Sequence, residues 1–299
     1  MRHLGAMRKQ IKRKLPVHEL YVLPYVGSKR RMVNDIQMLA PVDANELYEV
    51  CGGLGAYIIN KHRFFDRAVY NEINPQVFNL MEVIKDRIDE LSDRILMMQS
   101  TQDEFNEALE RIKDEGSDDV QRALDFVTLQ VNSYNNNRES YVEKVRDTHW
   151  KRTTRKRLYT VSEELQSIEL LSRDCFDILR DQKDNTNAFV MMDLPYPFDS
   201  QRVAKKLYKD HDWGDELHQK AYSMLEKMNG DVGCKVMICS YRSDLYDKLI
   251  DTGYWQRVEV KDMQSSAGGK GKKRNRRMEC VYINYTSVSH IAKMHYSID

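Results

Sequence analysis

Short apolar runs alternate with stretches of helical periodicity in the first third of the chain. LYEV at 47–50 and RAVYNEI at 67–73 are runs of strand-forming residues, and a helical pattern follows each of them. The Gly-rich CGGLGA, residues 51–56, separates the first run from its helix, and Pro75 opens the helix after the second. Proline suits the first position of a helix, where its missing amide donor is not needed. Strand, turn, helix, strand and helix in this order predict a doubly wound α/β fold.

The alternation stops between residues 87 and 163. This stretch is polar, helical in period and without a convincing strand pair, so we expect a mostly helical insertion over 87–163. The flanking segments 1–86 and 164–299 are expected to form one α/β domain. Strand and helix patterns resume in SIELLSRDCFDIL, NAFVMMDLPY, KVMICSY, QRVEVKDMQ and ECVYINY. The last two are period-2 runs around a Gly- and Lys-rich loop, which predicts a hairpin near the edge of a mixed sheet.

Positive charge is clustered although the chain is nearly neutral. The 299 residues include 47 Lys and Arg against 46 Asp and Glu, which gives a formal net charge of +1. Basic runs nevertheless open the chain and recur at 151–157 and 270–277. Three such runs favour local contact with a polyanion. Any one of them alone is more typical of a solvated loop or a terminus.

Several protein classes are excluded by what the sequence lacks. No apolar run approaches the ~18 residues of a membrane span, and the N-terminus has no apolar secretory core. The five cysteines form no Cys-x-x-Cys pair, so we expect neither a zinc site nor a disulfide framework. We therefore expect a metal-free protein in a reduced, cytoplasmic setting, with a monomer as the default state.

The CGGLGA turn and the acid after the next strand favour a nucleoside ligand. Glycines between a strand and a helix let the backbone approach a ligand closely. Glu72 ends the following strand, where a carboxylate can accept hydrogen bonds from ribose hydroxyls. The turn has neither a P-loop phosphate cradle nor a complete G-x-G-x-x-G pattern. S-adenosylmethionine, a nucleoside without phosphates, fits best, although packing glycines and a solvated carboxylate stay open for each feature alone.

The segment DLPY, residues 193–196, carries the chemistry that such a ligand would serve. Asp193 follows an apolar strand, so its side chain is expected in the crevice where doubly wound sheets bind ligands. Pro195 has no amide donor and leaves a carbonyl free to accept, and Tyr196 offers a ring that can stack on a base. Two acceptors and a stacking face suit a planar ring with an exocyclic amine. A structural strand end with a Pro-Tyr turn is the alternative.

DLPY resembles the D-P-P-Y motif of amino-methyltransferases, and the chain as a whole resembles the Dam-type DNA adenine-N6 methyltransferase family. PYVGSKRRM is similar to the family's N-terminal cofactor motif, YEVCGGLGA to its E-P-F-x-G-x-G-A turn, and YNEINP to its D-I-N motif. RDCFDIL resembles its D-F segment and MECVYINY its C-terminal strand, commonly E-x-L-x-x-N-Y. Five motifs in the family's order, spread over most of the chain, make the resemblance specific.

The resemblance implies an S-adenosylmethionine-dependent, Rossmann-like α/β fold and a role for each matching residue. The cofactor would be bound by Tyr25, Lys29, Glu49, Gly53, Gly55, Glu72, Asp174, Phe176 and Asp193. The target base would be held by Asp193, Pro195 and Tyr196. Residues 87–163 occupy the place of the family's target-recognition region. Double-stranded DNA would meet the basic residues Lys151, Arg152, Arg155, Lys156, Arg157, Lys272, Lys273 and Arg274.

The implied reaction is metal-free methyl transfer to the amine of an adenine that is flipped out of the duplex. Asp193 and the Pro195 carbonyl would accept hydrogen bonds from the amine and stabilise the charge that develops on it. The recognition sequence is not readable from the sequence. A role in restriction protection, in host marking or in phage defence is equally open.

The chain departs from the family pattern at three places. Val50 and Cys51 replace Pro-Phe, Glu72 replaces Asp, and Leu194 replaces the first Pro of the motif. Glu72 lengthens the reach to the ribose by one methylene, and Val50-Cys51 removes one aromatic wall of the expected cofactor pocket. A cytosine-N4, RNA-adenine or protein-glutamine methyltransferase is the nearest alternative. An inactive DNA-binding relative is the alternative from another class.

Overall fold

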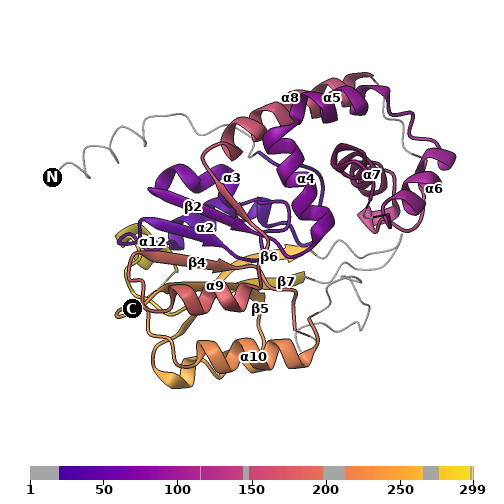
Figure 1. Cartoon of the computed structure of the whole chain (residues 1–299). Helices are drawn as coiled ribbons and strands as arrows, with labels where there is room; N and C mark the ends of the chain where they lie inside the picture. Colours follow the sequence, from indigo (N-terminus) through magenta and orange to yellow (C-terminus); the bar gives the residue numbers. More distant parts are fainter. Residues whose placement is uncertain are drawn as a thin grey trace.

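A seven-stranded sheet carries most of the apolar runs (Figure 1). The computed structural model describes residues 20–114, 116–143, 148–197, 213–264, 276–296 and 298. The strands are β1 (Glu46–Glu49), β2 (Arg67–Asn71), β3 (Glu169–Leu171), β4 (Ala188–Met192), β5 (Lys235–Tyr241), β6 (Gln256–Gln264) and β7 (Arg276–Ile283). Their order is β3-β2-β1-β4-β5-β7-β6; the first five run parallel, and β7 is antiparallel to β5 and β6. The predicted doubly wound mixed sheet and its edge hairpin are confirmed.

Helices cover both faces of this sheet and enclose two hydrophobic cores. Side chains alternate along each strand, so in β1 Leu47 is buried in one core and Tyr48 in the other. The first core is covered by α2 (Val33–Leu39), α3 (Ile58–Lys61), α4 (Pro75–Asp86) and α12 (His290–Tyr296). The second is covered by α9 (Cys175–Gln182) and α10 (Asp215–Leu225), which Figure 1 labels, and by α11 (Asp244–Asp247). None of the helices in the described ranges combines the length and apolar character needed to cross a bilayer.

The stretch between α4 and β3 is helical in its described residues. It holds α5 (Ile88–Met97), α6 (Gln102–Arg111), α7 (Asp119–Val131) and α8 (Thr148–Leu165), which gather beyond one end of the sheet (Figure 1). Both α7 and α8 pack on α4, and the first core runs without a break from the sheet into these helices. The insertion therefore shares its main core with the α/β part. The helix α8 continues to Leu165, two residues past the predicted end of the insertion.

Local sequence explains where the helices beside the parallel strands begin. Pro75 is the first residue of α4, and the Asn74 side chain accepts hydrogen bonds from the amides of Gln76 and Val77. Asp174 caps α9 by accepting from the amide of Phe176. Shorter 3-10 helices are η1 (Lys29–Arg31), η2 (His62–Phe64), η3 (Tyr134–Asn136) and η5 (Ile250–Thr252). The caps hold the loops after the parallel strands at one edge of the sheet, where ligands of such folds bind.

Candidate active site

A cleft of about 1400 Å³ opens at the carboxyl ends of β1, β2 and β4. Its floor is formed by the loops after these strands, at 49–56, 71–76 and 193–196. Segment 25–29 and the start of α9 also line it, and the opposite wall comes from α6 and the loop at 134–139. Three loops of the sheet and one wall of the insertion thus face a single cavity.

The Gly-rich turn brings bare backbone to the cleft surface. Gly53 and Gly55 have φ values of 51° and 64°, a region that side chains disfavour. Only Gly53 lines the cleft: a Cβ on the buried Gly55 would face Ile58, Ile59 and Met81 of the first core, so the structure does not bring this predicted cofactor residue to the cavity. A Cβ on Gly53 would lie 3.3 Å from Cε1 of Tyr25, so this glycine and this ring come close together at the cleft. Gly52 has a different reason, because a Cβ there would collide with the ring of Tyr70. The predicted pair Gly53 and Tyr25 is therefore brought together, and Gly52 is a packing glycine.

Two carboxylates bind backbone amides in this turn and at the start of the helix that follows it. Glu72 accepts from the amides of Gly53 and Asn74, each at 2.8 Å, and so ties the turn to the end of β2. Glu49 is buried and accepts from the amide of Ile58 at 2.8 Å, at the start of α3. Burial raises the pKa of Glu49 to about 8, although the helix amides oppose the rise. Both predicted residues line the cleft, and both also have a structural role there.

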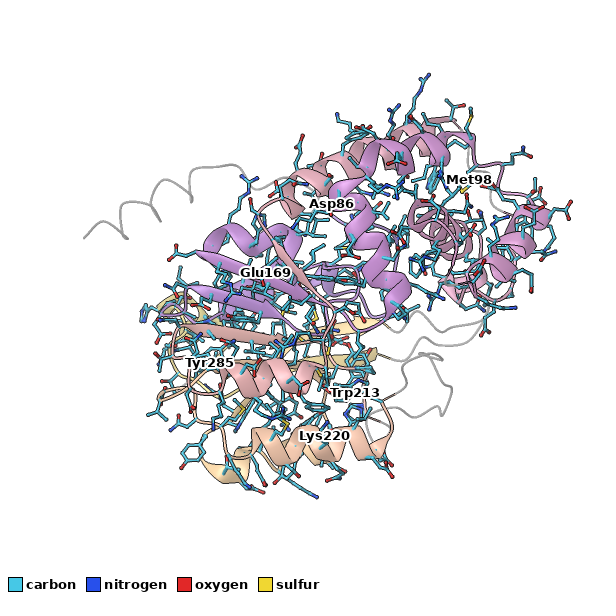
Figure 2. The ribbon with its side chains drawn as sticks, viewed as in Figure 1. Asp86, Met98, Glu169, Trp213, Lys220 and Tyr285 are labelled. Atoms are coloured by element: carbon cyan, nitrogen blue, oxygen red, sulfur yellow. The ribbon has the colours of Figure 1, made fainter. Side chains whose placement is uncertain are left out.

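An aromatic wall lies beside the start of α9. The buried ring of Phe176 packs on Trp213 with ring centroids 5.3 Å apart, and Nζ of Lys220 lies 4.1 Å from the Phe176 centroid. Figure 2 shows Trp213 beside α10, which carries Lys220. The structure brings the predicted Asp174 and Phe176 to the cleft. Trp213 was missed because it lies 37 residues further along the chain in no recognisable motif.

The positions that depart from the family pattern are accommodated by packing. Val50 and Leu194 are buried in the second core, where aliphatic side chains fit. Cys51 lines the cleft and forms a hydrogen bond with Cys175, which together with burial raises the pKa of the Cys51 thiol well above its usual range. Cys51 is therefore a neutral thiol at physiological pH, and the aromatic surface of the cleft comes from other residues.

The acid of DLPY forms an ion pair with the lysine of the N-terminal motif. Nζ of Lys29 lies 2.6 Å from Oδ1 of Asp193, and the Lys29 side chain is only 4% exposed. Burial raises the pKa of Asp193, and Lys29 opposes that rise. Burial alone would lower the pKa of Lys29, but chiefly Asp193, with Tyr196 and Glu279, holds it well above its usual value. The lysine stays charged and opposes protonation of a carboxylate that is only 20% exposed.

Tyr196 extends this pair to a second carboxylate. Its hydroxyl accepts from Nζ of Lys29 at 2.9 Å and donates to Glu279 at 2.9 and 3.0 Å. Its ring packs on Tyr241 with centroids 4.2 Å apart, so one face is already covered. Pro195 lines the cleft, and its carbonyl has no hydrogen-bond partner within the described ranges. Stacking of a base on Tyr196 stays a prediction that would use the remaining face.

Glu279 and Tyr241 are site residues that sequence reasoning missed. Glu279 lies on β7 and is 5% exposed; it is the register partner of Tyr241 on β5. The glutamate opens the motif MECVYINY, so a signal was present, but its strand gave no indication that the side chain reaches DLPY.

The basic residues predicted to contact DNA divide into three groups. On α8, three of them already bind the chain: Lys151 donates to the carbonyl of Leu96, Arg155 lies 3.5 Å from Asp93, and Arg157 donates to the carbonyl of Val22. Arg152 and Lys156 are exposed on the same helix. Lys272, Lys273 and Arg274 lie outside the described residues. Within the described part of α8, only the second group presents open positive charge.

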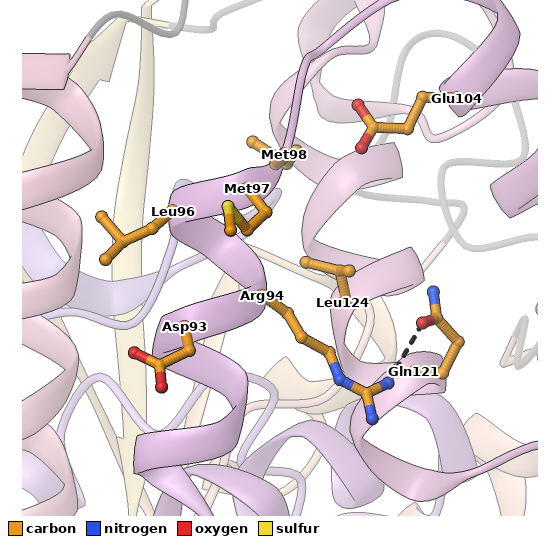
Figure 3. A pocket seen from close by; sticks show the side chains of 8 residues that line it. All are labelled: Asp93, Arg94, Leu96, Met97, Met98, Glu104, Gln121 and Leu124. Atoms are coloured by element: carbon orange, nitrogen blue, oxygen red, sulfur yellow. Dashed lines mark hydrogen bonds between the residues drawn. The ribbon is translucent and has the colours of Figure 1, made fainter.

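A second, smaller pocket of about 620 Å³ lies within the insertion (Figure 3). It is formed by α5, α6 and α7, and Arg94 donates to Gln121 on its floor at 3.1 Å. It shares no lining residue with the cleft. Nowhere in the described ranges do three or more His, Cys, Asp or Glu side chains gather in a way that could hold a metal ion.

Comparison with known proteins gives a consistent answer. A model of the D12 class N6 adenine-specific DNA methyltransferases matches residues 25–266. The chain is 25% identical to the type II methyltransferase M.MjaIII of Methanocaldococcus jannaschii over 282 residues, covering 84% of this chain and 94% of that protein. It is 29% identical to the modification methylase LlaI of Lactococcus lactis subsp. lactis over 119 residues, covering 38% of this chain and 19% of that protein. The chain belongs to the D12 class of N6 adenine-specific DNA methyltransferases.

Proposed function

We propose that the cleft binds S-adenosylmethionine together with an adenine flipped out of duplex DNA, and that Asp193 receives the adenine amine. The observation that carries this proposal is the Lys29–Asp193 pair, which lies in the same cavity as the Gly53 turn. A base inside a stacked duplex cannot reach an enclosed carboxylate, so flipping is required. The volume of about 1400 Å³ has room for a nucleoside cofactor and one base.

The residues of the cleft fit this cofactor. The bare backbone at Gly53 permits close approach, Glu72 is a carboxylate held at a strand end, and Phe176 with Trp213 gives an apolar surface for a purine. When bound, S-adenosylmethionine supplies an activated methyl group whose leaving group is a neutral thioether. Asp174 and Tyr25 complete the set that would hold it.

The chain's own residues would activate the target amine by accepting hydrogen bonds from its two N–H groups. The lone pair of an adenine amine is delocalised into the ring, so hydrogen bonds to both N–H groups favour a nitrogen that can attack. Oδ1 of Asp193 is bound by Lys29, which leaves Oδ2 and the Pro195 carbonyl as acceptors. Both also stabilise the positive charge that develops on nitrogen.

Base flipping can be measured directly once a methylated sequence has been identified. We expect 2-aminopurine placed at the target adenine to gain fluorescence when the enzyme binds, because the base leaves the stack. The same probe one position away should change much less. An enzyme that methylates the duplex without this local change would argue against an extrahelical base.

Substitution of Gly53 with alanine should weaken binding of S-adenosylmethionine about tenfold or more, an effect of about 1.4 kcal/mol. The added methyl would enter the narrow space beside Tyr25, and the residue would keep a positive φ. Calorimetric titration of the cofactor measures this. Gly253→Ala is the matched control, because Gly253 also has a positive φ (79°) but has open space around it. Equal loss of affinity in both variants would show that backbone strain, and not the close contact between Gly53 and Tyr25, lowers the affinity for the cofactor.

The combined variant Arg152→Gln, Lys156→Gln should bind DNA with a weaker salt dependence. We expect the slope of log affinity against log salt to become less steep by about 1.8, if each side chain neutralises one phosphate. Binding titrations over a range of salt concentrations measure the slope. Lys183→Gln is the control. Lys183 is exposed and precedes β4, so it lies near the amino-terminal ends of the parallel strands, away from the cleft at their carboxyl ends. An unchanged slope in the α8 variant would remove this helix face from the DNA contact.

A further inference from the structure

Glu279 is a buried carboxylate that the chemistry proposed above does not use. It is 5% exposed on β7, and it accepts hydrogen bonds from the hydroxyls of Tyr196 and Tyr241. Burial raises its pKa, and Lys29 opposes that rise. Burial of an ionised carboxylate costs free energy unless hydrogen bonds and nearby charges replace its lost hydration. Two tyrosine hydroxyls and one nearby lysine are the groups that do so for Glu279.

The hydrogen bonds that join Lys29, Tyr196 and Glu279 have one direction when the Glu279 carboxylate is ionised. An ammonium group only donates, so the Tyr196 hydroxyl must accept from Lys29. The single hydroxyl proton of Tyr196 is then donated to Glu279. Glu279 therefore determines which way the Tyr196 hydroxyl points.

The same chain of bonds uses every proton of Lys29. Its three donors go to the Gly27 carbonyl at 3.2 Å, to Tyr196 at 2.9 Å and to Oδ1 of Asp193 at 2.6 Å. The ammonium cannot rotate without losing a partner. Oδ1 of Asp193 is held by the shortest of these bonds, and Oδ2 has no partner among the residues that the structure describes.

We propose that Glu279 is a positioning residue for methyl transfer. It accepts the Tyr196 proton, so that this hydroxyl holds the Lys29 ammonium against Asp193 and the second carboxylate oxygen of Asp193 is presented to the target amine. The inference rests on the proposed function of Asp193. It differs from a purely structural role, in which Glu279 would only anchor Tyr196 and Tyr241 to β7.

A double-mutant cycle between Glu279 and Tyr196 tests the inference. Glu279→Gln and Tyr196→Phe should each lower kcat about tenfold with little change in the KM for S-adenosylmethionine. Because both break the same chain of bonds, the double variant should also lose about tenfold and not about a hundredfold. A product of the two single losses, or an unchanged kcat in Glu279→Gln, would overturn the proposal.

The pH profile separates positioning from structural support. Lys29, Asp193, Tyr196 and Tyr241 face the Glu279 carboxylate, whereas Lys261, opposite it on β6, is engaged with Asp35. Asp193 raises the pKa of Glu279, and an ionised Glu279 repels the Asp193 carboxylate in return, so we expect loss of the Glu279 charge to lower the pKa of Asp193. The acid limb of kcat/KM should therefore move to lower pH in Glu279→Gln. If Glu279 only anchors the two tyrosines and has no electrostatic effect on Asp193, the acid limb of kcat/KM should stay at the same pH in Glu279→Gln.

Two further variants keep the test decisive. Glu259→Gln makes the same chemical change at an exposed position on the neighbouring strand β6, and it should retain wild-type kcat. Glu279→Asp keeps the charge if Glu279→Gln fails to fold, and it withdraws the carboxylate by one methylene. It should lower kcat without moving the acid limb, and full activity in it would contradict the proposal. Loss of methylation in the wild-type protein would instead count against the proposed function itself.

Discussion

Asp193→Ala is expected to lower methyl transfer to DNA by about a thousandfold or more, because it removes the charged acceptor beside the reacting amine. Cofactor affinity should change by less than about threefold, which is under 1 kcal/mol. The protein should still fold, since the Lys29 ammonium keeps Tyr196, Glu279 nearby and the Gly27 carbonyl as partners. Single-turnover transfer and a cofactor titration measure the two effects separately.

The matched control for this variant is Asp184→Ala. Asp184 is 88% exposed and precedes β4 at the edge of the sheet opposite the cleft, so its loss should leave the rate unchanged. Asp193→Asn keeps the shape and removes the charge, and we expect it to lose about a hundredfold. Near-wild-type transfer by Asp193→Ala would show that the amine is activated elsewhere.

Lys29→Met is expected to have the second-largest effect. It leaves the buried Asp193 and Glu279 carboxylates without their cation, so both pKa values rise further above their usual range. The proposed reaction uses the ionised form of Asp193, so activity near neutral pH should fall by about a hundredfold. The acid limb of kcat/KM should move to higher pH, because a carboxylate with a raised pKa ionises only at higher pH. A pH series of single-turnover rates measures the shift.

Lys29→Met should also lower the free energy of unfolding. Removal of one partner from a buried ion pair costs about 3 kcal/mol, although the 20% exposure of Asp193 reduces this cost. The double variant Lys29→Met, Glu279→Gln removes one of the two uncompensated charges and should recover part of the stability. A Lys29→Met enzyme with the wild-type acid limb would contradict the role of the lysine in keeping Asp193 ionised.

The succession of strands and helices along the chain was predictable because each element follows from local sequence. Strand-forming runs such as RAVYNEI, the glycines after β1 and Pro75 each act within a few residues, so the parallel part of the sheet and α4 follow directly. The hairpin β6–β7 has the same local origin. Boundaries moved by two or three residues: α8, for example, continues through the predicted end of the insertion because Leu165 is still buried in the first core.

Residues that meet only through the fold were harder to predict. Lys29 was assigned to the cofactor, but its contact with Asp193 spans 164 positions and depends on how η1 packs against the end of β4. Glu279 reaches Tyr196 across 83 positions through the antiparallel strand β7. The burial of Arg157 against Val22 likewise depends on tertiary packing, which a count of basic residues does not register.

The central claim is that this cleft transfers a methyl group to the N6 amine of adenine in DNA. Incubation of the enzyme with radiolabelled S-adenosylmethionine and unmodified duplex DNA of mixed sequence, followed by nucleoside analysis, tests it most directly. The account predicts labelled N6-methyladenine with the wild-type enzyme and none above background with Asp193→Ala. Label on cytosine, label on DNA that persists in Asp193→Ala, or a wild-type enzyme that binds the cofactor and leaves DNA unlabelled would each contradict it.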